Sequence, residues 1–451
     1  MKKHTPSVIV LGGGLSGMAA AMALAQGGAC EVTIVERGGT LGGLAGTFQR
    51  GERFYPLAYH HILHRDRTLL WFLDHIGVLG DVRWRKIRML FRMQDRAYDL
   101  SRPLDFLRFP MRFPDKLRFV RLMLRCFAKS DWSDWHERSA GELVDLWGGP
   151  GVRETLFESL TDLKFRLPCS AVSGAWLGAR LHFREGSAPL GYIPGTNWTK
   201  TLCDGISRRL DELGIHVCAN SSIVGLRERD GRLAGVDLEG GRQIDADLVV
   251  TTVPTEVYHS LAPGDRTPAL DTIRYTAVVS FVCATRQIVQ PEFYWMNLPT
   301  RDLNACGIFR LETLNPTIGE RGDVCLNFVT HVPSRDHHFF QRDDEQLISG
   351  YLDDFRRVFG FELQPFWSHL TRLPMYSPVF LRGYRNPPVR SRTYPNVYFA
   401  GNYCTFPSIA STGTALWSGL QAAAALLEDR GMRIDLPREV EEFRLRSMPR
   451  G

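Results

Sequence analysis

The alternation of apolar and polar stretches is clearest at the start of the chain. Residues 8–11 form a continuous apolar run, which is typical of a parallel strand covered on both faces. Glycines follow at once, and the alanine-rich residues 18–25 predict a helix. A second apolar run at 31–35 predicts another strand. Strand, helix and strand in this order indicate a βαβ unit and therefore an α/β fold.

The turn between the first strand and the helix has the pattern GxGxxG. Its backbone is formed by Gly12, Gly13, Gly14, Leu15, Ser16 and Gly17. Gly12 permits the tight turn, Gly14 allows a pyrophosphate to approach, and Gly17 allows close packing of helix and strand. Glu36 ends the second strand nineteen residues after Gly17, where a carboxylate can accept hydrogen bonds from a ribose. A glycine-rich turn without a ligand is the alternative, but the four features together favour a bound dinucleotide.

The residues after Glu36 indicate which dinucleotide is bound. Residues 37–46 read Arg-Gly-Gly-Thr-Leu-Gly-Gly-Leu-Ala-Gly. This segment resembles the glycine-rich extension of the superfamily of FAD-dependent amine oxidases, phytoene desaturases and protoporphyrinogen oxidases. The resemblance implies that FAD lies beside Arg37, Gly42, Gly43 and Leu44. Many members carry arginine where Leu44 stands, so the resemblance points to the desaturase and protoporphyrinogen oxidase-like branch.

The middle of the chain resembles the same superfamily more weakly. Residues 191–195 (Gly-Tyr-Ile-Pro-Gly) precede a predicted helix that ends near Leu213. In the segment 215–226, the resemblance implies a backbone contact between Ile223 and the adenine end of FAD. Residues 247–254 are similar to the strand that closes the flavin domain, although a simple buried strand explains the same residues.

A late segment carries the second specific motif. Residues 397–402 (Val-Tyr-Phe-Ala-Gly-Asn) and 411–415 (Ser-Thr-Gly-Thr-Ala) precede an apolar helix. By resemblance, the FAD contacts here come from Gly401, Asn402, Gly413, Thr414 and Ala415. Amides near Thr414 and Ala415 are expected to point at the flavin pyrimidine ring, where a helix N-terminus stabilises negative charge. The family usually has aspartate where Asn402 stands, and asparagine can still donate and accept hydrogen bonds.

The resemblance implies a discontinuous, Rossmann-type FAD-binding domain and a second domain for the substrate. The FAD-binding domain is expected from residues 1–75, 191–260 and 391–435, and a mixed α+β substrate domain from 76–190 and 261–390. A length of 451 residues agrees with two domains. The GxGxxG pattern occurs once, so no nicotinamide-binding domain is expected. Electrons are then expected to leave to oxygen, a quinone or another acceptor, or to return to the substrate.

Three side chains are candidates for catalysis. The run His60-His61-Ile62-Leu63-His64 is similar to a histidine run of UDP-galactopyranose mutases. The resemblance places His61 near the flavin, where an imidazole can tune charge or relay a proton. A histidine pair that is only hydrogen-bonded structure is the alternative. Lys164 and Tyr376 are further candidates for the substrate pocket.

Positive charge is concentrated between Arg83 and Lys129. This segment holds fourteen lysines and arginines against four aspartates, or about +10, so the rest of the chain carries about −4 of the total +6. At 115–129 a predicted helix has two faces: Leu117, Val120, Leu124 and Phe127 on one, and Arg118, Arg121 and Arg125 on the other. Apolar residues just upstream are Phe106, Phe109, Pro110, Met111 and Phe113. The pattern predicts an interfacial helix on an anionic membrane, or else an ordinary helix packed on its domain. Because no nucleic-acid-binding module is present, no nucleic-acid partner is expected.

Cysteines and hydropathy bear on the location. The nine cysteines show no CxxC or other metal-ligand spacing, which predicts reduced thiols and no metal site. No stretch approaches the roughly 18 apolar residues of a spanning helix. We therefore expect a cytoplasmic protein, peripheral on the inner face of the membrane if the basic helix binds lipid.

The function expected from these patterns is that of an FAD-dependent oxidoreductase of the desaturase or oxidase type. It would dehydrogenate, saturate or isomerise an apolar substrate, namely an isoprenoid, another lipid or a tetrapyrrole. Three alternatives stay open: a UDP-galactopyranose mutase-like enzyme without net redox, an amine oxidase, and a flavin-bound protein that only shields a lipid. The oligomeric state and the linkage of the flavin, covalent or not, do not follow from the sequence.

Overall fold

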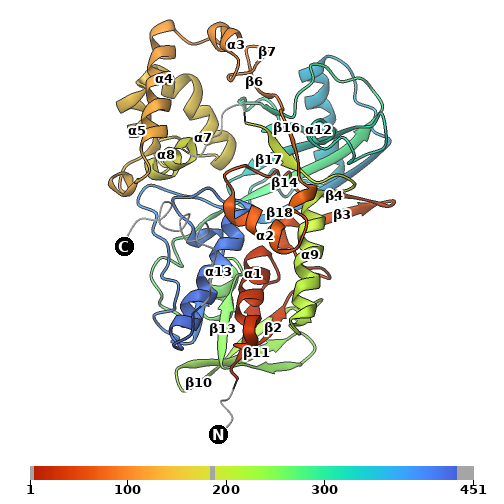
Figure 1. The fold of residues 1–451 in the computed structure, drawn as a ribbon. Helices are drawn as coiled ribbons and strands as arrows, with labels where there is room; N and C mark the ends of the chain where they lie inside the picture. The colour runs from red at the N-terminus through yellow and green to blue at the C-terminus, as the bar shows by residue number, and fades with distance from the viewer. Residues whose placement is uncertain (1–4, 183–187, 434–451) are drawn as a thin grey trace.

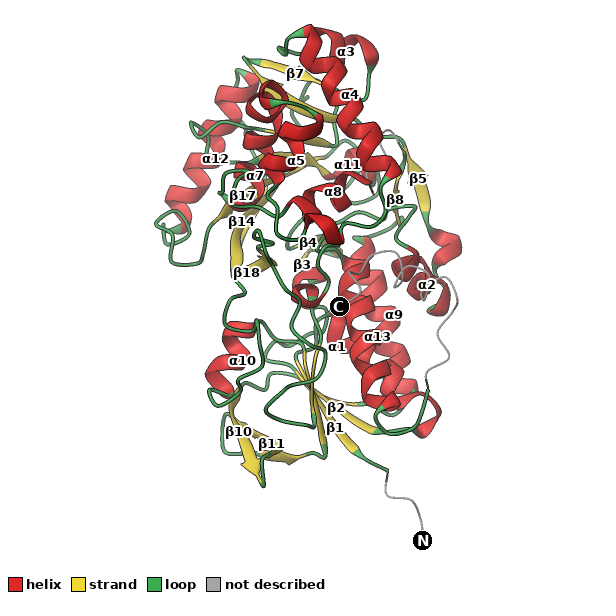
Figure 2. Ribbon diagram, turned by 90° about the vertical axis from the view of Figure 1, so that its left-hand side faces the viewer, coloured by secondary structure: helices red, strands yellow, loops and turns green. Residues whose placement is uncertain are grey.

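The computed structural model describes residues 5–182 and 188–433, which form two layered units (Figures 1 and 2). The lower unit in both views is built on a parallel five-stranded sheet with the order β19-β13-β1-β2-β9. Its strands are β1 (Ser7–Leu11), β2 (Glu31–Val35), β9 (His216–Cys218), β13 (Leu248–Thr251) and β19 (Val397–Phe399). The predicted α/β fold with a Rossmann-type unit is confirmed.

Alternate residues of β1 face opposite layers, as the period of a strand requires. Val8 and Val10 pack against three helices: α1 (Leu15–Ala25), α9 (Trp198–Glu212) and α13 (Thr412–Glu428). Ile9 and Leu11 face the other side of the sheet. There lies an antiparallel sheet of β10 (Ile223–Arg229), β11 (Arg232–Leu238) and β12 (Gln243–Asp245). Both faces of the parallel sheet are thus covered, which explains the uninterrupted apolar runs.

The upper unit contains a seven-stranded sheet with the order β18-β14-β17-β16-β15-β6-β7. Its strands are β6 (Met89–Met93), β7 (Arg96–Tyr98), β14 (Tyr275–Thr285), β15 (Trp295–Asn297), β16 (Gly307–Arg310), β17 (Val324–Val332) and β18 (Trp367–Pro378). All neighbours are antiparallel except β15 and β6. Helix α12 (Asp344–Phe359) packs Leu347, Tyr351 and Phe355 on one face. Tyr294 and Phe309 belong to the core on the other face, which borders the site described below.

A helical layer covers the end of the seven-stranded sheet (Figure 1). It comprises α3 (Pro103–Arg108), α4 (Phe113–Ala128), α5 (Ala140–Trp147), α6 (Pro150–Val152), a π-helical turn (Arg153–Phe157), α7 (Glu158–Phe165) and α8 (Gly174–His182). In both views α3 and α4 lie at the end of the molecule farthest from the parallel sheet. The predicted helix at 115–129 therefore exists and starts two residues earlier.

Further strands and helices lie outside these layers. They are β3 (Thr47–Arg50), β4 (Arg53–Pro56), α2 (Arg67–His75), β5 (Arg83–Arg85), β8 (Leu190–Tyr192), α10 (Thr255–Leu261) and α11 (Leu311–Leu314). β3 pairs with β4 and β5 pairs with β8. Within the described residues, none of the helices combines the length and apolar character needed to cross a bilayer. All nine cysteines are buried and free.

Candidate active site

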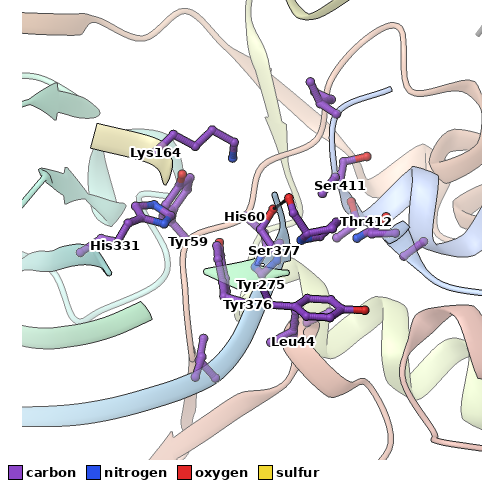
Figure 3. A pocket seen from close by; sticks show the side chains of 18 of the residues that line it. Leu44, Tyr59, His60, Lys164, Tyr275, His331, Tyr376, Ser377, Ser411 and Thr412 are labelled. Carbon is purple, nitrogen blue, oxygen red and sulfur yellow. Dashed lines mark hydrogen bonds between the residues drawn. The ribbon is translucent and has the colours of Figure 1, made fainter. Parts of the chain in front are cut away.

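One cavity of about 930 Å³ lies between the two units. The phosphate loop, the glycine-rich extension and the start of α13 form one side, and α7, α8, β17 and β18 contribute to the other. Figure 3 draws Ser411 and Thr412 on one side of this pocket and Lys164, Tyr59 and His331 on the opposite side. The cavity is thus shared by both units, as a site for a cofactor and its substrate requires.

Most of the predicted cofactor residues line this cavity. They are Gly12, Gly14, Leu15, Ser16, Glu36, Arg37, Gly42, Gly43, Leu44, Ile223, Gly401, Asn402 and Ala415. Gly17, Gly413 and Thr414 do not line the cavity. The two glycines allow close packing of the segments behind the cavity wall. A Cβ at Gly17 would collide with the carbonyl oxygen of Gly12, and one at Gly413 would collide with the carboxylate of Asp66.

The glycine-rich extension lies directly on the phosphate loop. Gly42 N donates a hydrogen bond to Gly13 O at 2.8 Å, and Gly42 and Gly14 form a parallel bridge. A Cβ on Gly43 would stand 3.0 Å from Gly14 Cα, and Gly43 has a φ of +56°. Two backbones therefore approach each other in a way that only glycine permits here. The resulting cradle of bare backbone fits a pyrophosphate.

Glu36 is fixed before any ribose arrives. Its Oε2 accepts a hydrogen bond from Gly13 N at 2.7 Å, and its Oε1 accepts one from Gly38 N at 2.6 Å. Each carboxylate oxygen keeps a second lone pair, so the group can still accept from a ribose hydroxyl. The donor set and the glycine cradle both fit the predicted dinucleotide.

The hydrogen bonds at the start of α13 show which of its backbone amides are free. Thr414 N donates to Ser411 Oγ at 3.2 Å and Ala415 N donates to Ser411 O at 3.1 Å, so both amides are used within the helix. The amides of Thr414 and Ala415 themselves are therefore not free, so the predicted contact with the flavin ring is left to amides near them. The first helical residues are Thr412 and Gly413. Their amides belong to the turn that has no helical acceptors, so they are the groups left for an anion.

Asn402 is held by the same helix start. Its Oδ1 accepts a hydrogen bond from Thr414 Oγ1 at 2.9 Å. The amide nitrogen of Asn402 remains as a donor, whereas the aspartate usual in the family could only accept. Ser418, which the sequence analysis missed, accepts from Gly401 N at 2.9 Å, and its Oγ lies 3.1 Å from Ser16 Oγ. It joins the phosphate loop, β19 and α13.

All three predicted catalytic residues reach the cavity wall. His61 Nδ1 lies 3.5 Å from Tyr294 Oη, and burial, with smaller effects of His60 and Arg180, lowers the pKa of His61 to about 4. His61 is therefore a neutral imidazole near pH 7. Tyr376 is a protonated phenol, because burial raises its pKa, and its ring centre lies 5.6 Å from that of His331. His60 fits the structural alternative, since its Nδ1 lies 2.9 Å from Ala58 O.

Lys164 at the end of α7 has an unusual environment. Burial and the nearby guanidinium of Arg180 lower the pKa of Lys164 to about 7. Burial also lowers the pKa of Arg180 on α8. His331 at the end of β17 is neutral, since burial and then Lys164 and Arg166 lower its pKa to about 3. Arg180 and His331 were missed from the sequence, although each is a polar residue within an apolar run.

Aromatic rings form much of the remaining wall. Tyr59 stacks on Phe309 with ring centres 3.7 Å apart, and Phe309 stacks on Trp295 at 5.0 Å. Many other wall residues are apolar, among them Met89, Phe91, Leu156, Phe157, Leu160, Leu163, Leu177, Leu181, Val257 and Leu261. Such a surface favours an apolar ligand and excludes water from the space beside the cofactor.

The exposed face of α4 differs from that of an ordinary surface helix. Leu117 and Leu124 are 59% and 63% exposed, and Phe113, Val120 and Phe127 on the same helix are exposed as well. Its buried residues include Leu122 and Cys126. The alternative that the predicted apolar face packs on the domain is therefore wrong. Two upstream residues assigned to the interfacial segment, Phe109 and Met111, are buried in the core instead.

The arginines of α4 are only partly free. Arg118 donates to Asp115 Oδ1 at 2.8 Å, and Arg121 donates to the carbonyl oxygens of Leu146 and Trp147 at the end of α5. Arg125 is exposed. Arg121 therefore anchors α4, which the prediction of a solvated arginine face did not foresee.

Comparison with known proteins agrees with this geometry. The model of the family of flavin-containing amine oxidoreductases matches residues 15–427. The chain belongs to this family. It is an FAD-dependent oxidoreductase, and the predicted cofactor is confirmed. No curated protein sequence matches the chain.

Solved structures share the fold at low sequence identity. A protein assigned as a protoporphyrinogen oxidase from Exiguobacterium sp. 255-15 has a TM-score of 0.76 at 17% identity and covers 94% of this chain and 99% of its own. A reduced UDP-galactopyranose mutase has a TM-score of 0.72 at 13% identity, covering 97% and 98%. A putrescine oxidase bound to putrescine has a TM-score of 0.69 at 14% identity, covering 94% and 99%. The resemblance to the superfamily is thus confirmed, and these similarities concern the fold alone.

Proposed function

We propose that this enzyme dehydrogenates, saturates or isomerises an apolar substrate, such as an isoprenoid, another lipid or a tetrapyrrole. The observation that carries the proposal is the shared cavity, in which the cofactor-binding loops face a wall of aliphatic and aromatic side chains. Bound FAD supplies hydride transfer at N5, so the protein needs no further redox group.

The protein side chains position the substrate and exclude water. Tyr59, Phe309 and Trp295 form a stacked aromatic surface on which a flat or conjugated substrate can lie. His61 and Tyr376 carry no charge near pH 7. They can orient a polar atom of the substrate by hydrogen bonding, while a full positive charge beside the reacting carbon is avoided.

We further propose that α4 binds a membrane surface on the cytoplasmic side. Its exposed leucines and phenylalanines can enter the boundary of the acyl chains, and the basic segment 83–129 can face anionic headgroups. A lipid substrate would then reach the enzyme from the bilayer. The test is sedimentation with phosphatidylglycerol vesicles. Leu124→Glu should reduce binding, whereas Ile288→Glu, at an 81% exposed site on another part of the molecule, should not.

A mutase-like reaction without net oxidation is the second candidate. The histidine run lines the cavity, and Lys164 and Arg180 could hold a diphosphate. This reading predicts that uridine diphosphate protects the enzyme against proteolysis, which the lipid reading does not. An amine oxidase is disfavoured, since these two cations would repel a charged amine; release of hydrogen peroxide from simple amines would restore it.

The first experiment is the visible spectrum of purified protein before and after heat denaturation. Flavin absorbance that passes to the supernatant shows non-covalent FAD, and absorbance that stays with the precipitate shows a covalent link. Anaerobic incubation with candidate lipids then tests the reaction. Bleaching of oxidised flavin tests dehydrogenation, reoxidation of dithionite-reduced flavin by an unsaturated lipid tests saturation, and product analysis tests isomerisation. A bound flavin that gives none of these three results with lipids would favour the lipid-shielding alternative and contradict the proposed enzyme.

A further inference from the structure

Two cations on the cavity wall have no counterion among residues 5–182 and 188–433. Lys164 on α7 and Arg180 on α8 make neither an ion pair nor a side-chain hydrogen bond with any described residue. Their neighbours are aromatic: Lys164 Nζ lies 5.5 Å from the centre of the Phe165 ring, and the Arg180 guanidinium lies 5.7 Å from that of Trp176. Removing charges from water without pairing them is costly.

Arg166, two residues after Lys164 at the end of α7, shows the contrast. Its guanidinium pairs with Asp162 at 3.2 Å and donates to His331 O at 2.9 Å. A neighbouring arginine on the same helix end is thus fully used, whereas the two cations on the wall are not. The difference indicates that Lys164 and Arg180 are available to bind an anionic group of a ligand.

Two buried hydrogen-bonding atoms at the same end also have no partner. Trp176 Nε1 and His331 Nδ1 are unsatisfied, although the residues are only 2% and 6% exposed and both line the cavity. Trp176 lies one helical turn before Arg180 on α8, and His331 is close enough to Lys164 for that charge to lower the pKa of His331. An indole N–H can only donate, so it suits an acceptor.

The carboxylates on the described cavity wall are occupied elsewhere. Glu36 is held by two backbone amides in the phosphate loop, and Asp66 caps α2 through Leu69 N at 3.2 Å. Asp99 pairs with Arg88 and Arg102. None of these three carboxylates forms an ion pair with Lys164 or Arg180, so both cations are open to an anion of a ligand on the described part of the wall.

We propose that Lys164, Arg180 and the Trp176 indole bind an anionic oxygen group at one end of the substrate. The substrate is then an amphipathic acid, a carboxylate or a phosphate, whose apolar body runs along the leucine and aromatic wall towards the cofactor loops. This inference rests on the proposed function and narrows its substrate class, since neutral lipids are excluded. Guanidinium and ammonium groups with an indole donor provide charge-assisted hydrogen bonds to such oxygens.

The test is binding to the FAD-loaded protein, read by isothermal titration and by the change in the flavin spectrum. The probes share a twelve-carbon chain: dodecanoate, dodecyl phosphate, dodecanol and dodecylammonium, each below its micelle concentration. At least one anion should bind 10-fold or more tightly than dodecanol, and dodecylammonium should bind least. The tighter anion identifies the headgroup as carboxylate or phosphate.

Variants separate the two cations from a general charge effect. Arg180→Met and Lys164→Met should each weaken anion binding about 10- to 100-fold, the range of one charge-assisted hydrogen bond, with dodecanol binding unchanged. Arg180→Lys should retain part of the affinity. Arg301→Met removes an exposed cation near Asp162, outside the cavity, and should have no effect.

Equal affinity for dodecanoate, dodecyl phosphate and dodecanol would overturn the inference, as would equal losses in Arg180→Met and Arg301→Met. The proposed function fails differently. A protein that binds the anions tightly but neither transfers hydride between its flavin and any lipid acid, in either direction, nor isomerises one would retain the anion site and contradict the proposed reaction.

Discussion

Replacing Lys164 by methionine should stabilise the ligand-free protein most in weak acid, and this gain should shrink steadily as the pH rises from 7 towards 10. In the unfolded chain this lysine loses its proton near pH 10.5, and in the folded protein burial brings its pKa down to about 7. Between these two values unfolding takes up a proton, so the wild-type protein gains stability as the pH rises. Below pH 7 the folded protein carries the full cost of an unpaired charge.

The size of this effect follows from the two pKa values. One pKa unit corresponds to about 1.4 kcal/mol, so lowering the pKa from 10.5 to about 7 sets an upper limit on the order of 5 kcal/mol for the pH-dependent part. Methionine has a similar length and no charge. At pH 6 the melting temperature of Lys164→Met should therefore exceed that of the wild type by several degrees, and the two should converge as the pH approaches 10.

The assay is thermal unfolding followed by tryptophan fluorescence from pH 5.5 to 10, without added ligand. Lys200→Met is the matched control, because Lys200 is paired with Asp204 on the surface of α9. Its curve should run parallel to that of the wild type. Parallel curves for wild type and Lys164→Met, or a variant less stable at pH 6, would refute the reasoning that this charge is buried without a partner.

Two further predictions concern the cofactor loops and the histidine run. Gly43→Ala places a Cβ 3.0 Å from Gly14 Cα at a φ of +56°, so the purified variant should lose most of its flavin absorbance per protein, whereas Gly80→Ala, with open space around it, should keep it. Full flavin content in Gly43→Ala would contradict the close contact of the two loops. Stability should fall as the pH drops from 6.5 towards 4, because burial lowers the pKa of His60 and His61 to about 4 and only the unfolded chain takes up protons in this window. A melting temperature that falls as steeply in His61→Gln as in the wild type would argue against a buried, neutral His61.

The phosphate loop could be predicted from the sequence because its function depends on backbone, and glycine is the residue that exposes backbone. Gly12, Gly14 and Gly43 can be recognised directly in the sequence, and their spacing indicates which loops approach each other. The position of Glu36 near the phosphate loop could be predicted because only one helix and one strand separate the two in the sequence. Local chain geometry thus determines this half of the site.

The other half could not be predicted in the same way. Arg180 and His331 lie on α8 and β17, about 150 residues apart in the chain, and only the packing of α7 against β17 brings them to one cavity. In the sequence, each of these two residues is recognisable only as a polar residue within an apolar run. This pattern does not indicate which distant residues lie near it in the fold. The outward face of α4 had two interpretations for the same reason: amphipathicity gives two faces but does not tell which one is covered.

The Ser16–Ser418 contact joins positions 402 residues apart, and β19 completes a sheet that begins with β1. During synthesis at roughly 5–20 residues per second, the N-terminal phosphate loop therefore leaves the ribosome well before its partners on α13 exist. The complete cradle for FAD therefore forms only after nearly the whole chain has been made, and we expect stable loading with FAD to be a late step of folding.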